Sequence, residues 1–319
     1  MEQQLVSILT PCYNGENTLP RLLDSIIAQT YRPIELVLVN DGSTDGTDAV
    51  IQAYQSRLEY AGISLVYQYQ ENRGLGGAVD TALKMFHGEY ICFADADDYL
   101  AEMSVAHRVQ FLSKHPEFAV VTSDAYLVKD SDCTKPIRRV SAGFKNNDEE
   151  HQFWHLLSAD SIFCTGCHML RTTDFLKVNP ERSIYPARRG QNWQILLPMY
   201  YHFKRFFLNE PLYYYVVSDC SMSHDKTAEE QLYRCDEHEE ILQNTLQRIS
   251  LTDSDRREAT RLVKENYARK RLYIARETSN RILAESSYAA LRAAGACTMR
   301  DRLCYSCIKN PCIRKILRR

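Results

Sequence analysis

A cluster of carboxylates follows directly on the apolar run Tyr90 to Ala94, in the order Asp95-Ala96-Asp97-Asp98. Carboxylate oxygens are the ligands that hard divalent cations such as Mg²⁺ and Mn²⁺ prefer. A cation held there would bridge a diphosphate and neutralise the charge that grows on a leaving phosphate. Acidic pairs are also common in solvated turns, which is the alternative for this run taken alone. Its place at the end of a predicted strand favours a metal site.

Three earlier loops contain residue types that suit a nucleotide. Tyr13 has a flat ring that can stack on a base, and the Asp41 carboxylate can accept hydrogen bonds from a base N–H or a ribose hydroxyl. A helix N-cap is the alternative for Asp41, because it lies in an Asn-Asp-Gly-Ser turn. Arg73 can contact a base or a phosphate, and Gly74 permits a close approach of the backbone. Together these loops predict a nucleotide-binding site.

Short apolar runs alternate with amphipathic stretches through the first hundred residues, which is typical of βαβ units in a mostly parallel sheet. Strands are predicted at 5–9, 34–39, 64–70 and 90–94, with helices between them that end near residues 29, 61 and 86. Each strand ends in a polar loop. In open α/β sheets the loops beyond the carboxyl ends of the strands form the ligand-binding crevice. We therefore expect Tyr13, Asp41 and Asp95 to meet in one site.

The second half of the chain has a different character. Residues 118–128 are predicted as a strand and residues 133–148 as a charged, irregular segment. Beyond Thr227 the sequence is polar and helical as far as about residue 294. The last 21 residues contain seven Lys and Arg side chains against one acid, Asp301, with apolar residues between them, which suits an anionic membrane surface. The predicted organisation is an α/β domain at 1–225, a helical appendage at 226–298 and a basic amphipathic tail at 299–319.

Composition narrows the class of protein. Hydrophobic residues make up 45% of the 319 residues, enough for a buried core, and a formal net charge of -2 creates no global field that would attract nucleic acid. No apolar run reaches the roughly 18 residues of a membrane-spanning helix, and no signal peptide is recognisable before the first strand. Eleven cysteines, an odd number, fit a reducing compartment. We expect a cytoplasmic protein, peripheral at the inner membrane face through its tail, with no nucleic-acid partner.

Five motifs in order along the chain carry a resemblance to a known family. They are Val6 to Asn14 (VSILTPCYN), Ile26 to Tyr31 (IIAQTY), Val39 to Thr47 (VNDGSTDGT), Asn72 to Gly76 (NRGLG) and Gly88 to Asp98 (GEYICFADADD). The chain resembles the family-2 glycosyltransferases, strongly over about the first hundred residues, more weakly as far as Val217 and not beyond. The resemblance implies the α/β GT-A nucleotide-diphospho-sugar transferase fold, with a mostly parallel Rossmann-like sheet, to which this chain adds a C-terminal helical appendage.

The resemblance also implies a reaction. Members of this family transfer a sugar from a nucleotide-diphosphate sugar, often a uridine one, in a single displacement that inverts the anomeric carbon. Mn²⁺ or Mg²⁺ is the implied cofactor, and the acceptor would be a carbohydrate or a lipid-linked glycan in cell-surface polysaccharide synthesis. Asp95 and Asp97 match residues that address the ribose, diphosphate and metal. The positions that match the family's nucleotide-binding motifs are Pro11, Tyr13, Asn14, Asp41, Arg73, Gly74 and Asp95.

One stretch departs from the family pattern. Members commonly have a Glu-Asp pair before an aromatic residue, and that Asp removes the proton from the acceptor hydroxyl. The matching residues here are Gln191, Asn192 and Trp193. An amide has no basic lone pair for proton abstraction, so we expect Asn192 to orient the acceptor instead.

The general base must then come from another residue, and Asp98, Asp219 and His224 are the candidates. His224 lies where some relatives bring a late histidine to the metal, and a surface histidine is the alternative for it. Without a replacement base the chain would be a non-catalytic nucleotide-sugar-binding or scaffolding protein with the same fold.

Overall fold

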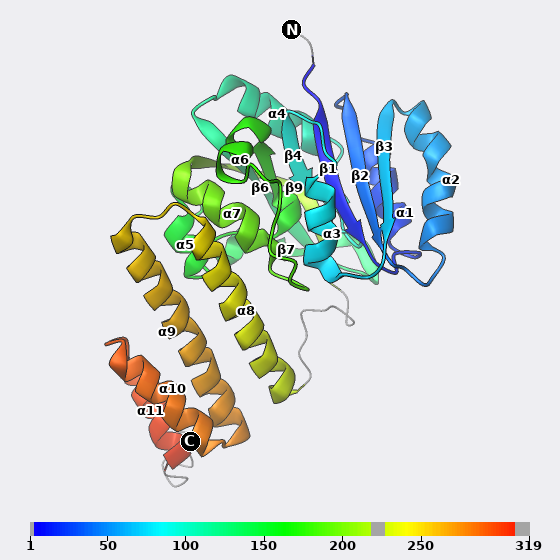
Figure 1. Ribbon diagram of the computed structural model, residues 1–319. Helices are drawn as coiled ribbons and strands as arrows, with labels where there is room; N and C mark the ends of the chain where they lie inside the picture. The colour runs from blue at the N-terminus through cyan, green and yellow to red at the C-terminus, as the bar shows by residue number, and fades with distance from the viewer. Residues whose placement is uncertain (1–2, 218–226, 310–319) are drawn as a thin grey trace. The chain divides into compact units, whose positions relative to one another are not determined.

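The computed structural model describes residues 3–217 and 227–309 of the chain. Contacts divide the chain into two compact units, Met1–Asp219 and Cys220–Arg319. The first unit is built on one sheet and the second on helices (Figure 1). The predicted site residues Asp219 and His224 lie outside the described residues, as does the predicted domain boundary at residue 225.

Parallel strands form one half of the sheet, in the order β3-β2-β1-β4. Every residue of β1, β2 and β4 is buried, as expected for parallel strands that are covered by helices. The strands are β1 (Val6–Cys12), β2 (Ile34–Asp41), β3 (Ile63–Gln70) and β4 (Tyr90–Phe93). The helices that connect them are α1 (Leu19–Ile27), α2 (Thr47–Tyr60) and α3 (Gly74–Leu83).

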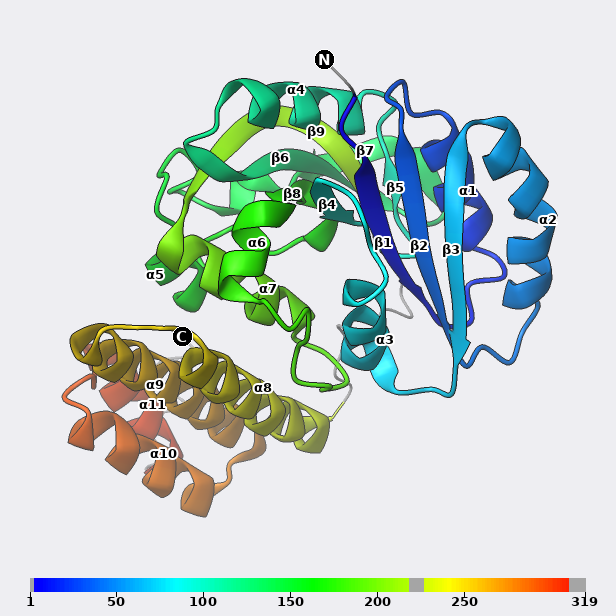
Figure 2. The same cartoon turned by 45° about the horizontal axis from the view of Figure 1, so that its top comes forward.

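The other half of the sheet is mixed and continues as β4-β8-β6-β9-β5. β8 pairs antiparallel with β4 and β6, β9 runs parallel to β6, and β5 pairs antiparallel with β9. Figure 2 shows β6 and β9 as long curved strands. A further strand, β7, forms a hairpin with β6. The bounds are β5 (Tyr99–Leu100), β6 (Phe118–Lys129), β7 (Asp132–Arg139), β8 (His168–Arg171) and β9 (Lys204–Val217).

Short helices and turns accompany this mixed half. A buried arginine of α4, Arg108, donates through Nη1 to the carbonyl oxygen of Gly166 at 3.0 Å and so fixes the turn η2 (Thr165–Cys167). Helix α7 begins after Gly190, whose φ of +77° is a conformation that glycine adopts without strain. The remaining bounds are α4 (Ser104–Lys114), η1 (Ser141–Gly143), α5 (Phe153–Leu157), α6 (Thr172–Val178) and α7 (Gln191–His202).

The second unit consists of helices around its own core. Thr227 and Glu230 form a capping box that begins the first of them. Apolar side chains from three helices, among them Leu272, Leu291 and Ile308, make the core. No helix within the described ranges is long and apolar enough to cross a membrane. The helices are α8 (Ala228–Arg248), α9 (Asp253–Thr278), α10 (Arg281–Ala293) and α11 (Met299–Lys309).

The structure confirms the predicted α/β class and the C-terminal helices. The prediction of an irregular segment at 133–148 was wrong, because β7 occupies its first part. Most of the β7 side chains are exposed and several are charged, so the strand lacks the alternation of apolar and polar residues that marks a half-buried strand. The first part of the predicted amphipathic tail is helix α11, whose Cys304 and Ile308 are buried in the core of the second unit.

Candidate functional site

The sheet order places three of the predicted loops side by side. Cys12 at the end of β1 pairs with Asn40 of β2, so Tyr13 and Asp41 begin neighbouring loops. On the other side of β1, Leu9 pairs with Phe93, and Asp95 follows two residues later. Because these strands are parallel, their carboxyl ends share one edge of the sheet. The predicted nucleotide residues and the acidic cluster therefore flank the end of β1.

Asn14 ties the first two loops together. Its main-chain N–H donates to Ser43 Oγ at 2.9 Å, and its side-chain Oδ1 accepts from the Thr44 N–H at 2.9 Å. Asn14 has a left-handed φ of +51°, which asparagine tolerates better than most residues. The neighbouring Tyr13 is 53% exposed, so its ring is accessible for stacking on a base. The hydrogen bonds of Asn14 therefore fix the loop in which Tyr13 lies.

Asp41 is buried and holds the loop that precedes α3. Its Oδ1 accepts hydrogen bonds from Gln70 Nε2 at 2.6 Å and from the main-chain N–H of Arg73 at 2.9 Å. The N-cap alternative for Asp41 is excluded, because the N-cap of α2 is Gly46. The Arg73 guanidinium runs back along α3, with Nη1 3.5 Å from Thr81 Oγ1 and Nη2 4.0 Å from Asp80. Arg73 therefore meets Asp41 through its backbone and not through its side chain.

The loop after β4 is held from both sides. The main-chain N–H of Asp95 donates to the hydroxyl oxygen of Tyr213 at 3.1 Å, and the Asp97 carbonyl accepts from Arg21 Nη2 at 2.6 Å. Asp97 is exposed as a residue and Asp95 is half-buried, and burial of the Asp97 carboxyl raises its pKa above the usual range. Desolvation and the neighbouring charge of Asp97 raise the pKa of Asp95 to about 7. The charge of Arg21 acts on Asp97 and partly offsets the effect of its burial.

A divalent cation fits this pair of carboxylates. Within residues 3–217 and 227–309, no group of three or more His, Cys, Asp or Glu side chains is arranged to hold a metal ion. Mg²⁺ is usually bound by one or two carboxylates together with waters and substrate phosphates, and Asp95 and Asp97 match that donor set. Burial and, after it, the charge of Asp97 raise the pKa of Asp95, and a bound cation would favour the charged form of both carboxylates.

Asp98 and Asn192 have structural partners. Asp98 is 1% exposed, and its Oδ1 accepts from the Val216 N–H at 2.8 Å. Burial and the charge of Asp95 raise the pKa of Asp98 well above its usual range. Asn192 Oδ1 accepts from Thr165 Oγ1 at 2.8 Å, and its Nδ2 donates to the Phe163 carbonyl at 2.8 Å. The amide at position 192 therefore joins the start of α7 to the turn η2.

Sequence patterns missed several residues that shape this site. Arg21 and Thr165 carry no local signal, because their partners are distant in the sequence. Tyr213 belongs to a run of three tyrosines, and its contact with Asp95 depends on the pairing of β9 in the sheet. Gly166 lies against the Tyr213 ring so closely that an added Cβ would be 2.1 Å from ring carbons. The turn η2, Tyr213 and the acidic loop are therefore one packed unit.

Solved structures of two other proteins have a similar fold. Residues of this chain superpose on Staphylococcus aureus TarS 1–349 in complex with UDP-GlcNAc with a TM-score of 0.64, at 17% sequence identity, over 91% of this chain and 81% of that one. The mannosyltransferase PcManGT from Pyrobaculum calidifontis, in complex with GDP-Man and Mn²⁺, matches with a TM-score of 0.56 at 17% identity, over 95% of this chain and 78% of that one. The fold is GT-A, as the sequence predicted.

The family model of glycosyl transferase family 2 matches residues 7–178, more than half of the chain. The chain therefore belongs to glycosyl transferase family 2.

Curated relatives cover only part of the chain. An uncharacterized glycosyltransferase of Rickettsia prowazekii is 34% identical over 142 residues, which are 43% of this chain and 42% of the relative. The chain is 34% identical over 170 residues to Escherichia coli WfaP, a UDP-Glc:alpha-D-GlcNAc-diphosphoundecaprenol beta-1,3-glucosyltransferase, covering 53% of this chain and 62% of WfaP. The chain spans less than half the length of several such relatives.

Proposed function

We propose that the protein is an inverting glycosyltransferase that moves a sugar from a uridine-diphosphate sugar to a carbohydrate or lipid-linked acceptor in cell-surface polysaccharide synthesis. The observation that carries the proposal is the arrangement of Asp41 and the Asp95–Asp97 pair on either side of β1, within a chain of glycosyl transferase family 2. Support for uridine comes from TarS, whose structure contains UDP-GlcNAc, and from WfaP, whose name specifies UDP-Glc. The diphosphoundecaprenol acceptor of WfaP supports a lipid-linked acceptor here.

Each side of the site has a role in this proposal. Tyr13 stacks on the base, and the Asp41 loop contacts the nucleoside. Asp95 and Asp97 hold Mn²⁺ or Mg²⁺, and the cation when bound supplies positive charge next to the donor diphosphate. Pro11, Asn14, Arg73 and Gly74 shape the loops through their backbones, as the hydrogen bonds of Asn14 and Arg73 support.

On the acceptor side, the proposed general base is a residue other than Asn192. Asn192 donates its amide N–H to Phe163 and accepts from Thr165, so it positions the wall next to the acceptor rather than removing a proton. Asp98, Asp219 and His224 remain the proposed bases, with His224 also proposed as a metal ligand. Asp98 would have to lose its proton against the burial that raises its pKa, which places more weight on the other two.

Donor hydrolysis tests the proposal. Purified protein should hydrolyse or transfer from a UDP-sugar in the presence of Mn²⁺, and EDTA should stop the reaction. Asp97→Ala should abolish turnover, whereas Asp24→Ala, which removes an exposed carboxylate of α1, should not. Full activity of Asp97→Ala would overturn the metal assignment. Donor binding without turnover on any acceptor would favour the alternative, a non-catalytic nucleotide-sugar-binding or scaffolding protein.

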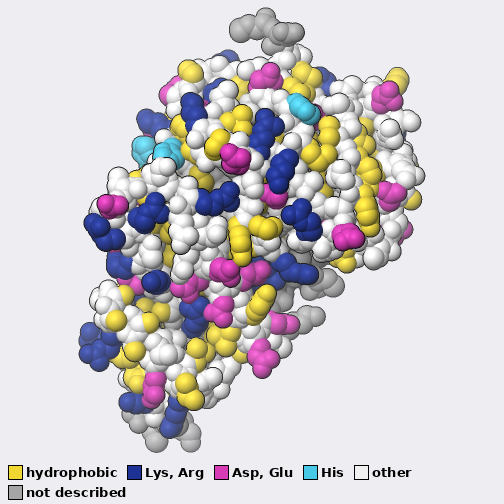
Figure 3. All heavy atoms as spheres, in the orientation of Figure 1, with side chains coloured by type: hydrophobic (Ala, Val, Ile, Leu, Met, Phe, Trp, Pro, Cys, Tyr) yellow, Lys and Arg dark blue, Asp and Glu magenta, His cyan; other side chains and the backbone are white. Residues whose placement is uncertain are grey.

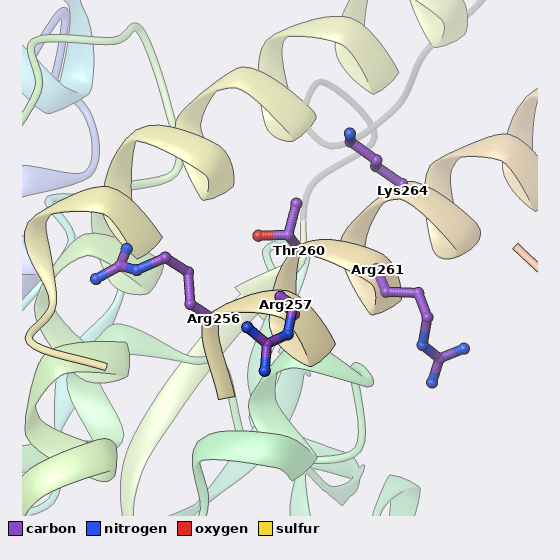
Figure 4. Close-up of a pocket in the computed structure, with 5 residues that line it drawn as sticks. All are labelled: Arg256, Arg257, Thr260, Arg261 and Lys264. Atoms are coloured by element: carbon purple, nitrogen blue, oxygen red, sulfur yellow. The ribbon is translucent and has the colours of Figure 1, made fainter. Parts of the chain in front are cut away.

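The charge of residues 256–319 in the second unit supports a peripheral position at the inner face of the membrane. Residues 256–309 contain thirteen Lys and Arg against five Asp and Glu. Arg256, Arg257, Arg261 and Lys264 of α9, with Thr260, line a cavity of about 380 Å³ (Figure 4). On the face drawn in Figure 3, basic and acidic side chains are interspersed over the molecule. Basic side chains near an anionic surface contribute about 1 kcal/mol each to binding, so α9 adds to the attraction of the C-terminal tail.

Vesicle binding tests this location. We expect the protein to co-sediment with vesicles that contain phosphatidylglycerol and not with purely zwitterionic ones. Alanine at Arg257 and Lys264, or at the basic residues 314, 315, 318 and 319, should each weaken co-sedimentation, and Arg57→Ala in the first unit should not. Unchanged association in both sets of variants would eliminate the membrane proposal. The division into a catalytic domain at 1–225, an appendage at 226–298 and a tail at 299–319 belongs to the same proposal.

A further inference from the structure

The segment between α6 and α7 lies against α3, at the nucleotide side of the site. Asp80 of α3 is buried, and its Oδ1 accepts from Ser183 Oγ at 2.8 Å and from the Ile184 N–H at 3.0 Å. In Figures 1 and 2 the green chain that leads into α7 runs beside α3. The carboxylate of Asp80 therefore fastens this segment to the helix that follows β3.

Two glycines let the segment pass directly over the first turn of α3. A Cβ on Gly74 would lie 3.0 Å from Arg188 Cγ and 3.1 Å from Arg188 Cα, and a Cβ on Gly76 would lie 2.1 Å from the Ala187 carbonyl oxygen. Gly74 also has a φ of +75°, which other residues rarely adopt. The stem of Arg188 is thus held over Gly74, next to the Arg73 backbone that bonds to Asp41.

The Arg188 side chain is exposed. It makes no hydrogen bond or ion pair with any residue in the part of the chain that the structure describes. The other guanidinium at the start of α3 belongs to Arg73, and it is directed toward Thr81 and Asp80. Arg188 has no such contact with any described residue, so of the two it is the freer to bind a ligand at the carboxyl edge of the sheet.

An arginine in this position suits a phosphate. The planar guanidinium donates two parallel N–H groups to phosphate oxygens, and it keeps its charge at every physiological pH. In the proposed function, Asp95 and Asp97 would hold a cation that supplies positive charge to the donor diphosphate from the β4 side. One divalent ion held by two carboxylates would not neutralise the negative charge of the diphosphate. A second positive group on the α3 side would neutralise more of that charge.

We infer that Arg188 is a donor-binding residue whose guanidinium binds the diphosphate of the nucleotide sugar, a step that rests on the proposed function. Because Arg188 stands four residues before Asn192, donor binding by this residue also fixes the entry to α7 and the Asn192–Thr165 contact next to the acceptor. The segment 183–190 thereby links the nucleotide loops to the acceptor wall.

Binding of UDP and of uridine to the full chain, measured by calorimetry with Mn²⁺, tests this inference. Arg188→Ala should weaken UDP binding at least about tenfold, as loss of a hydrogen bond between charged groups entails, and leave uridine binding unchanged. Arg188→Lys should restore part of the UDP affinity. The matched control is Arg57→Ala near the end of α2, where the guanidinium pairs with Asp24 and lies at the opposite edge of the sheet.

The outcomes separate this inference from the proposed function. Unchanged UDP binding by Arg188→Ala, with normal binding by the wild-type protein, would overturn the role of Arg188 alone. An equal loss of UDP and uridine binding would also overturn it, because the loss of a contact with the diphosphate cannot weaken the binding of uridine, which has no diphosphate. Wild-type binding of GDP in place of UDP would overturn the uridine assignment, and the same comparison with GDP and guanosine would then decide the role of Arg188. A wild-type protein that binds no nucleotide would overturn both proposals.

Discussion

The main-chain N–H of Arg73 donates to the Asp41 carboxylate across 2.9 Å, so two residues that the sequence suggests as separate nucleoside contacts form one structural unit. Gln70 Nε2 donates to the same oxygen at 2.6 Å. One buried carboxylate thus closes the turn between β3 and α3. Asp41 therefore fixes the shape of the nucleotide loop in addition to supplying a carboxylate to it.

Asp41→Ala should therefore reduce both stability and ligand binding. It removes two hydrogen bonds that the partly buried amide of Gln70 and the N–H of Arg73 donate to a buried carboxylate, which costs about 1–3 kcal/mol of unfolding free energy. Urea unfolding gives this value, and uridine binding should weaken in parallel. Asp24→Ala, at an exposed ion pair, should cost less than about 1 kcal/mol. Equal stabilities of the two variants would refute the structural role of Asp41.

Restoring the acid at position 192 should not restore a base. In Asn192→Asp an oxygen would face the Phe163 carbonyl oxygen, which now accepts from Nδ2 at 2.8 Å, and the lost hydrogen bond should destabilise the fold by about 1–3 kcal/mol. We expect transfer rates no higher than wild type. Thr165→Ser keeps the hydroxyl that donates to Asn192 and serves as the control. A faster Asn192→Asp enzyme would show that position 192 reaches the acceptor.

Gly166→Ala should disturb the acidic loop through Tyr213. The added methyl group would lie 2.1 Å from the Tyr213 ring, and displacement of that ring breaks its hydrogen bond with the Asp95 N–H. Overpacking of this kind costs about 1–3 kcal/mol. Donor hydrolysis should fall together with the thermal unfolding midpoint. Gly143→Ala is the matched control, since the nearest atom to its Cβ is 3.8 Å away, and an effect of similar size there would argue against the packing explanation.

His168 should make the protein sensitive to acid. Burial, followed by the charges of Arg205 and Arg108, lowers the pKa of His168 to about 3 from its ordinary value of 6.5. Below pH 6.5 His168 is protonated in the unfolded chain, whereas in the folded chain it stays neutral until about pH 3. The contribution of neutral His168 to the free energy of unfolding is therefore complete above pH 6.5 and is lost as the pH falls toward 3. The loss is about 1.4 kcal/mol per pH unit, or about 2 kcal/mol at pH 5.

Denaturant unfolding at pH 7 and pH 5 checks this prediction. His168→Gln cannot titrate, so its stability should change less between the two pH values than that of the wild type. His151→Gln, at an exposed histidine, should keep the wild-type pH dependence. An identical pH dependence of wild type and His168→Gln would contradict the role of His168.

The sequence predicts the part of the site that depends on strand ends. Apolar runs followed by polar loops located Tyr13, Asp41 and Asp95, because the carboxyl ends of parallel strands must share an edge. The partners of Asn192, by contrast, lie 27 and 29 residues away on a segment without periodicity. Arg21 reaches the Asp97 carbonyl across 76 residues. Contacts of this kind come from packing between elements, and no local pattern marks them.

Helix α11 covers the apolar side chains of α9 and α10, and its buried Asp301 binds Arg269 of α9 with Oδ1 3.2 Å from Nε. Cutting the chain before Met299 would strip this cover from Leu272 and Leu291 and leave Arg269 without its acid. Such a truncated protein would lose vesicle binding through damage to its own helical core, whatever lipid its basic end prefers. A chain that ends after Lys309 lacks the basic residues 314, 315, 318 and 319 but keeps α11 packed on that core.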